Sequence, residues 1–329
     1  MIIMNRNTSP IKPLTDEQIF QAVKKTNINQ YPDQERMRFI NLYADYFDLN
    51  PENIEVANGS DEWIQKLIIT LGKNGVMSLN PDFVMYQVYT EQFLPKIEFV
   101  DADSNFDFDL DLVIAAIKEK RPSLFLISNP QNPTGMMFES KDLQRLADAM
   151  AEVDGFLGLD ECYIDFAVDY ERPKGKNIVL IRTLSKVYGM AGLRIGIAIA
   201  EKPTLDLITK INHPYPLSSL ALNLASELFS DRVALEKYKD YQFESKIKLS
   251  EALNQVSDLI QIKESFANYI FTYGDAAIDL AKFLIEKDFL CRIYDIPILS
   301  KAARYSIIEL DKYEALNAAI AEWRKGYVK

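Results

Sequence analysis

Between residues 59 and 200 the sequence alternates between segments with helical periodicity and short apolar runs, bounded by proline, glycine or acidic residues. The runs expected to be strands cover 76–79, 96–100, 123–128, 156–159, 178–182 and 194–200. The segments expected to be helices cover 61–71, 86–93, 110–119 and 140–152. Repetition of strand, helix and strand predicts an α/β fold with a mostly parallel central sheet covered by helices.

The pattern changes near Leu217, where it becomes mainly helical. A charged helical stretch over 236–252 leads into short strands at 269–272, 291–294 and 305–308, a helix over 277–287 and a final helix. These elements predict a smaller α+β unit, and 329 residues exceed the usual size of one core. We expect an N-terminal segment over 1–45 that joins the small domain, a large domain over 46–240 and a small C-terminal domain over 241–329.

Composition excludes several classes of function. A net charge of −11 argues against a nucleic-acid partner. The single histidine, His213, leaves no histidine cluster for a metal and makes a Ser-His-Asp mechanism implausible. Cys162 and Cys291 form no C-x-x-C pair, which fits a reducing cytoplasm, and the apolar stretch 1–4 is too short for a signal sequence or membrane span. We therefore expect a cytoplasmic protein without metal, nucleic-acid or membrane partners.

Polar residues follow several expected strands, and the carboxyl ends of parallel strands share one edge of a sheet. They are Ser128-Asn129, Asp160-Glu161, and Thr183 with Ser185-Lys186. Lys186 lies between an apolar run and a glycine-containing turn, where a neutral amine can form a Schiff base with an aldehyde. Polar residues end most strands, and a solvated surface lysine is the alternative, so each of these endings is ambiguous by itself.

A phosphate site is indicated where 59–62 opens a helix, because the first N–H groups of a helix attract anions. Ser60 could equally be a simple N-cap. Thr183 and Ser185 offer hydroxyls and Arg194 a guanidinium to the same dianion. The other candidates concern an aromatic heterocycle: Asp160 would stabilise its protonated ring nitrogen, and Asn132 and Tyr163 would hydrogen-bond its phenolic oxygen. Strand capping by Asp160 and a tight turn over 129–135 are the alternatives.

These motifs stand in a specific order: N-P-Q-N-P-T-G at 129–135, D-E-C-Y at 160–163, R-T-L-S-K at 182–186 and A-G-L-R-I-G at 191–196. In this order and spacing the chain resembles the fold-type I aminotransferases, which use pyridoxal 5'-phosphate (PLP). Within them it is most similar to the histidinol-phosphate aminotransferase family, through 31–33, 58–62, 81–86, Arg292 and Arg304. The resemblance covers nearly the whole chain.

The resemblance implies a fold-type I PLP-dependent transferase in which Lys186 is the catalytic lysine that carries the cofactor and moves the proton. It implies a homodimer with active sites at the subunit interface, to which Tyr31 would contribute from the partner subunit. The cofactor phosphate would be held by the backbone amides of Ser60, Asp61 and Glu62, with Thr183, Ser185 and Arg194. Tyr86 would stack on the ring, and Arg292 and Arg304 would bind an anionic group of the substrate.

The expected reaction is transamination between histidinol phosphate and 2-oxoglutarate in histidine biosynthesis. Three departures from the family pattern concern the substrate side: Thr8 replaces an acidic residue, Pro216 an asparagine and Ile308 a glycine. Threonine-phosphate decarboxylase and a broader amino-acid aminotransferase therefore remain alternatives. A non-catalytic PLP-binding regulator is a further one, although the first motif begins within ten residues of the N-terminus and leaves no room before it for a DNA-binding module.

Overall fold

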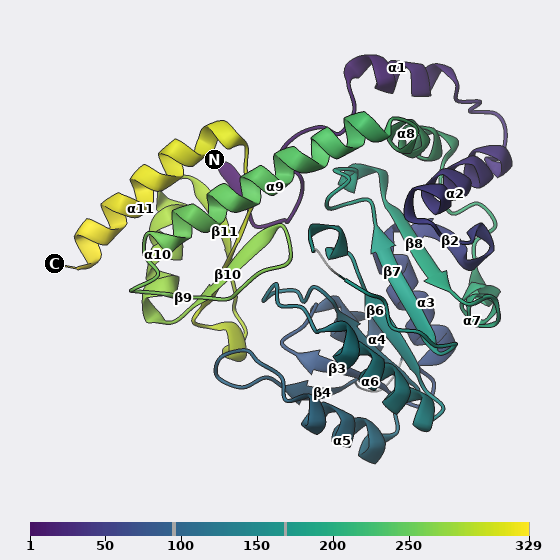
Figure 1. The fold of residues 1–329 in the computed structure, drawn as a ribbon, viewed down its shortest axis with the longest axis horizontal. Helices are drawn as coiled ribbons and strands as arrows, with labels where there is room; N and C mark the ends of the chain where they lie inside the picture. Colours follow the sequence, from purple (N-terminus) through teal and green to yellow (C-terminus); the bar gives the residue numbers. More distant parts are fainter. Residues whose placement is uncertain (94–96, 168–169, 329) are drawn as a thin grey trace.

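The computed structural model describes residues 1–93, 97–167 and 170–328, which form two sheets and the helices that cover them (Figure 1). The larger sheet has seven strands in the order β2-β8-β7-β6-β5-β3-β4. Their bounds are Ile54–Asn58 (β2), Val76–Asn80 (β3), Ile97–Asp101 (β4), Leu124–Ser128 (β5), Phe156–Asp160 (β6), Ile178–Thr183 (β7) and Ile195–Ala200 (β8). β8 runs antiparallel to both of its neighbours, and the other pairings are parallel. The prediction of a mostly parallel central sheet is confirmed.

Helices cover both faces of this sheet, which explains why its central strands are buried throughout. One face packs against α3 (Gly59–Leu71), α4 (Met85–Phe93) and α7 (Lys202–Ile208). The other packs against α2 (Asp33–Phe47), α5 (Leu110–Lys120), α6 (Ser140–Glu152) and α8 (Ser219–Ser230). In register, Ser128 lies opposite Asp160 and Asp160 opposite Ile181, so the polar ends of β5, β6 and β7 share one edge, as expected.

The smaller sheet has the order β1-β11-β12-β10-β9. Its strands are Ile2–Met4 (β1), Gln261–Ile262 (β9), Tyr269–Tyr273 (β10), Phe289–Ile293 (β11) and Ala302–Ser306 (β12). It packs with α10 (Asp275–Glu286) and α11 (Tyr313–Tyr327) around a separate apolar core. The predicted α+β unit at the C-terminus is therefore present, with the last strand beginning and ending earlier than the predicted 305–308.

The segment 1–45 is divided between the two cores. β1 pairs with β11 in the small sheet, whereas α1 (Asp16–Lys24) and α2 pack against α8 in the large core. The predicted boundary at residue 240 falls inside a continuous helix, α9 (Arg232–Asn254), which contributes Leu235 to the large core and Leu249 to the small one. Hydrophobic pattern alone did not reveal the span of α9, because a helix that contributes to two cores has an uninterrupted period.

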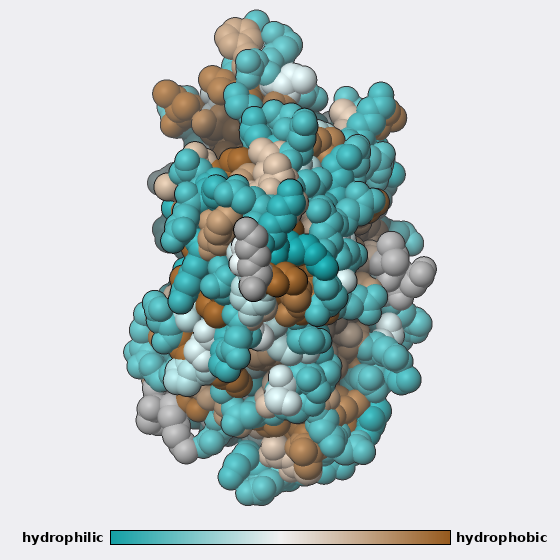
Figure 2. Space-filling view, turned by 90° about the vertical axis from the view of Figure 1, so that its left-hand side faces the viewer, coloured by the Kyte–Doolittle hydropathy of each residue, from teal (hydrophilic) through white to brown (hydrophobic). Residues whose placement is uncertain are grey.

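Among the residues that the structure describes, no helix has the length and apolar character that crossing a bilayer requires. The side of the molecule shown in Figure 2 is mostly hydrophilic. Hydrophobic residues are exposed at the top of that view, the end of the molecule at which α1 lies in Figure 1. Exposed apolar side chains of this region include Phe20, Val23 and Ile28.

Candidate active site

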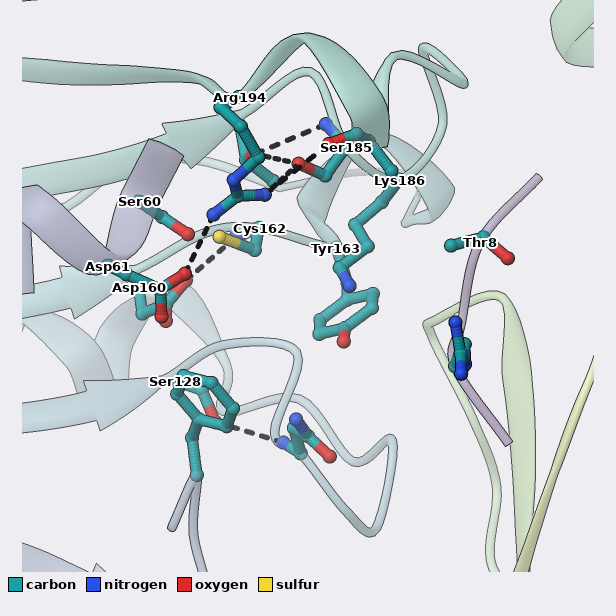
Figure 3. Close-up of a pocket in the computed structure, with 15 residues that line it drawn as sticks. Thr8, Ser60, Asp61, Ser128, Asp160, Cys162, Tyr163, Ser185, Lys186 and Arg194 are labelled. Carbon is teal, nitrogen blue, oxygen red and sulfur yellow. Dashed lines mark hydrogen bonds and ion pairs between the residues drawn. The ribbon is translucent and has the colours of Figure 1, made fainter. Parts of the chain in front are cut away.

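A cavity of about 270 Å³ lies at the carboxyl edge of the large sheet (Figure 3). Nine of the residues predicted for the site line it: Ser60, Asp61, Asn132, Asp160, Tyr163, Thr183, Ser185, Lys186 and Arg194. They come from positions that span more than 130 residues of sequence, and the parallel strands bring them to one place. Arg6, Thr8, Phe83, Ser128, Cys162 and Ala191 complete the lining.

One end of the cavity is built for an anion. The N-terminus of α3 has no side-chain cap, so its first N–H groups are available to a ligand. Around it stand the Ser60 hydroxyl, the Thr183 hydroxyl, which donates to Ser185 Oγ at 2.9 Å, and the Arg194 guanidinium, which donates to Ser185 Oγ at 3.4 Å. Arg194 also pairs with Asp61 at 2.8 Å (Figure 3).

Two glycines allow this end to be so compact. Gly59 has a φ of +80°, and a Cβ there would meet Arg194 Nη2 at 2.4 Å. Gly196 on β8 lies directly against the first turn of α3: its Cβ would stand 2.3 Å from the carbonyl oxygen of Gly59 and 2.6 Å from the backbone nitrogen of Ser60. Strand β8 therefore fixes the position of the helix N-terminus through backbone contact. The Glu62 side chain faces elsewhere, since it accepts from the Asn58 N–H at 2.7 Å and pairs with Lys66.

Asp160, at the end of β6, presents a buried carboxylate to the cavity. Tyr86 donates its hydroxyl to Asp160 Oδ2 at 2.9 Å, and the Cys162 N–H donates to Oδ1 at 3.0 Å. Burial raises the pKa of this carboxyl above its usual range. A cationic group bound beside it would favour its ionised form, so the site suits a protonated ring nitrogen.

The placement of Tyr86 corrects its predicted role. Its side chain is buried behind Asp160, within the core between α3 and the sheet, and it does not line the cavity. Of the two aromatic residues in the stretch 81–86, the one that lines the cavity is Phe83, one turn earlier. Phe83 and Tyr86 lie in the same short stretch, and which of the two faces the cavity cannot be told without the fold.

Lys186 extends into the centre of the cavity, with Nζ 5.4 Å from the centroid of the Tyr163 ring (Figure 3). Within the described ranges its side chain forms no ion pair and no hydrogen bond, so its amine is available for chemistry. The Tyr163 hydroxyl accepts from Asn7 Nδ2 at 3.0 Å. Tyr163 is thus tied to the N-terminal segment, on which Thr8 lies across the cavity from Asp160 and Arg194 (Figure 3).

The two arginines predicted to bind substrate differ in their surroundings. They face each other in the register of β11 and β12. Arg304 is buried, hydrogen-bonds Asn132 Oδ1 and donates to the Asn5 carbonyl at 3.2 Å, which places it beside the cavity lining. Arg292 is exposed, and its guanidinium lies 5.6 Å from the Tyr294 ring. Neither lines the cavity itself, and their role as a pair stays a prediction.

Tyr31 lies outside the cavity of its own chain; it is 72% exposed and stacks on Tyr215 with 4.3 Å between ring centroids. Its predicted function in a partner's site is untested. Sequence reasoning missed Arg6 and Cys162 as lining residues, although Arg6 lies two residues before Thr8 and Cys162 lies inside the motif D-E-C-Y. It had placed Thr8 on the substrate side, and Thr8 does line the cavity. Proximity to a motif was the available signal.

Comparison with known proteins shows the family to which this chain is similar. Residues 5–319 match the model of the family described as aminotransferase class I and II. A histidinol-phosphate aminotransferase of Hydrogenobaculum sp. (strain Y04AAS1) is 31% identical over 97% of this chain and 91% of its own length.

Two solved structures share the fold. The histidinol-phosphate aminotransferase of Sinorhizobium meliloti, in complex with pyridoxal-5'-phosphate, superposes with a TM-score of 0.87 at 20% identity, over 99% of this chain and 91% of that one. The L-threonine-O-3-phosphate decarboxylase of Porphyromonas gingivalis superposes with a TM-score of 0.77 at 20% identity, over 99% and 100% of the two chains. The fold therefore accommodates more than one named activity.

Proposed function

The chain belongs to the aminotransferase class I and II family, and we propose that it transfers an amino group between histidinol phosphate and 2-oxoglutarate, using PLP bound at Lys186. Relatives named for this activity align over almost the entire chain, which supports the choice of substrate. The cavity supports the choice of cofactor.

The residues present fit PLP at both ends of the cavity. The uncapped N-terminus of α3 and the cluster of Ser60, Thr183, Ser185 and Arg194 supply donors for a phosphate dianion. Asp160 supplies a buried acceptor for the ring nitrogen, and Phe83 an aromatic surface for the ring. We propose that Asn132 and Tyr163 face the phenolic oxygen. When bound, PLP supplies the electron sink that transamination requires.

Lys186 Nζ is the group we propose to move the proton. Nζ lies 5.4 Å from the centroid of the Tyr163 ring, and Lys186 and Asp160 line the same cavity. Asn7 donates a hydrogen bond to the Tyr163 hydroxyl and so fixes the ring beside which Nζ moves. Asp160, held by Tyr86 and the Cys162 N–H, keeps its carboxylate fixed while charge develops on the ring.

The anionic group of each substrate is proposed to be held at Arg304, with Arg292 opposite it on the neighbouring strand. One arginine pair can accept a phosphate or a carboxylate in turn, because both present two oxygens to a planar guanidinium. Use of one site by two anions suits a reaction in which the amino donor leaves before the acceptor binds.

One observation carries the proposal: Lys186 and Asp160 line a single cavity together with the anion cradle, which is the N-terminus of α3 with Ser60, Thr183, Ser185 and Arg194. We expect Lys186→Ala to bind PLP without a covalent link. After borohydride reduction, cofactor should stay attached to the wild-type protein and to the control Lys248→Ala on the exposed side of α9, but not to Lys186→Ala. A reducible linkage that persisted in Lys186→Ala would refute the assignment.

Substrate choice needs a separate assay, because the shared fold with a threonine-phosphate decarboxylase makes decarboxylation a second candidate. Formation of glutamate from histidinol phosphate and 2-oxoglutarate supports the proposal. Release of carbon dioxide from threonine phosphate, without glutamate formation, would replace it. A holo-protein that turned over neither donor and no other amino acid would favour a cofactor-binding regulator.

We also propose a homodimer that acts in the cytoplasm. The exposed apolar side chains of Phe20, Val23 and Ile28 offer surface for a partner copy, and Tyr31 is exposed nearby in sequence. The thiols of Cys162 and Cys291 are both free and buried, which suits a reducing compartment. Sedimentation of the holo-protein tests the dimer, and a monomer at micromolar concentration with full activity would contradict it.

A further inference from the structure

Arg6 is a charged lining residue to which the proposed function assigns no role. Its side chain lines the cavity, on the N-terminal segment that also carries Thr8. Among the residues that the structure describes, its guanidinium has no acidic partner and no hydrogen bond. A guanidinium carries five N–H donors, and all of those of Arg6 are available to a ligand.

We propose that Arg6 binds an anionic group of the substrate and helps to determine which donors and acceptors the enzyme accepts. The inference rests on the proposed function, because it assigns Arg6 to the substrate half of the same cavity. The chemical class is a carboxylate or phosphate carried by the substrate at a distance from its reacting carbon.

The backbone around Arg6 is fixed on both sides. The carbonyl of Asn5 accepts from Arg304 Nη2 at 3.2 Å. Asn7 is buried, donates its N–H to Ser306 Oγ at 3.0 Å and its amide to the Tyr163 hydroxyl at 3.0 Å. Asn268 donates to the Asn7 carbonyl at 3.0 Å. Arg6 is therefore presented from a held segment, which reduces the entropy lost when its side chain binds an anion.

The charges around the cavity favour an anion at Arg6. Of the two carboxylates in the lining, Asp61 is paired with Arg194 at 2.8 Å, and Asp160 is buried and bonded to Tyr86. Thr8, the other lining residue of the N-terminal segment, is neutral. The positive charge of Arg6 is thus not compensated from within the cavity.

Arg304 differs from Arg6 in how many donors it has left. Its two terminal nitrogens already donate to Asn132 and to the Asn5 carbonyl, and its Nε is buried without a partner. An anion at Arg304 therefore finds three free N–H groups, whereas one at Arg6 finds all five. Two separate cationic points, one constrained and one free, suit a substrate that carries two anionic groups, such as a dicarboxylate.

The test uses the holoenzyme with Arg6→Gln, Arg6→Lys and, as a matched control on the same segment, Lys12→Gln, whose side chain is exposed. We expect Arg6→Gln to raise KM for the anionic substrate about tenfold while kcat changes less than about twofold, because an exposed charge-assisted contact is lost without disturbing the reacting groups. Arg6→Lys should fall between, since it retains the charge but not the planar fork.

Two arms identify the anion. A rise in KM confined to glutamate points to the carboxylate, and a rise confined to histidinol phosphate points to the phosphate. Histidinol, which lacks the phosphate, should be used equally by both proteins. Unchanged KM values for both anionic substrates in Arg6→Gln, or an equal loss with histidinol, would overturn the proposal.

A binding measurement separates this inference from the proposed function. Inorganic phosphate and glutarate are titrated calorimetrically into wild-type, Arg6→Gln and Lys12→Gln holoenzyme. Weaker binding of either anion to Arg6→Gln alone supports the role of Arg6 even if no transamination is found. Equal binding of both anions to all three proteins refutes it.

Discussion

Gly196→Ala is the most direct test of the anion cradle. The added methyl would stand 2.3 Å from the Gly59 carbonyl oxygen and 2.6 Å from the Ser60 nitrogen, and both neighbours are backbone atoms of the first turn of α3. It would also stand 2.2 Å from the Gly59 carbonyl carbon, and non-bonded carbon atoms need about 3.5 Å, so the start of α3 must move by about 1 Å. The strand cannot yield easily, because β8 is paired on both sides.

The expected effect on cofactor affinity follows from that displacement. A hydrogen bond of about 2.9 Å that lengthens by about 1 Å is lost. One lost bond to a charged phosphate is worth about 1.5–3 kcal/mol, so PLP affinity should fall roughly 10- to 150-fold. Overpacking should also lower the free energy of unfolding of the apoprotein by about 1–3 kcal/mol.

The assay is a titration of the apoprotein with PLP, followed by absorbance, beside urea unfolding of the same protein without cofactor. Gly192→Ala is the matched control, because Gly192 lies four residues away with nothing within 4 Å of its Cβ position. We expect Gly192→Ala to bind PLP normally. If Gly196→Ala bound PLP as tightly as Gly192→Ala, the N-terminus of α3 would not be the phosphate site.

Two further predictions concern stability. Glu161→Gln breaks the ion pair with the buried Arg182, whose Nε lies 2.8 Å from Glu161 Oε2, and should lower the free energy of unfolding measured in urea by about 3 kcal/mol. The control Asp258→Asn, at the exposed pair with Arg324, should change that free energy little. Equal effects of the two substitutions would contradict the reasoning. Burial lowers the pKa of Lys246 from 10.5 to about 8, so the unfolded chain binds more protons than the folded one between these pH values. The contribution of Lys246 to the free energy of unfolding of the wild type therefore rises with pH from about 8 to 10.5. Lys246→Met should be more stable than wild type at pH 7 by on the order of 2–3 kcal/mol, and its free energy of unfolding should lack this rise with pH. If the free energies of unfolding of the two proteins changed with pH in parallel, the reasoning would be contradicted.

Elements with strong periodicity could be predicted closely from the sequence. The helix predicted over 140–152 is found as Ser140–Glu152, since its apolar face repeats regularly and it ends before the Asp154-Gly155 turn. The gathering of Lys186, Asp160 and Arg194 at one edge could also be predicted, because parallel strands bring their carboxyl ends together.

Features that depend on tertiary contact could not be predicted in this way. Strand β2 was missed, because it lies before the region 59–200 in which helical and strand segments alternate, and its pairing with β8 joins positions far apart in sequence. The exchange of Tyr86 for Phe83 at the cavity depends on which aromatic ring the core between α3 and the sheet accepts. The position of Arg6 in the cavity lining could not be predicted, because it depends on the pairing of β1 with β11, which brings the N-terminal segment to the site.

Helix α9 has a consequence for how the two units behave mechanically. It carries Leu235 and Tyr238 in one core and Leu249 and Leu253 in the other, and it contains neither glycine nor proline. An uninterrupted helix of this kind is stiff, so the small sheet cannot rotate against the large one by bending a flexible linker at this position. Loss of either core would expose half of the helix, and we expect the two units to melt in one transition.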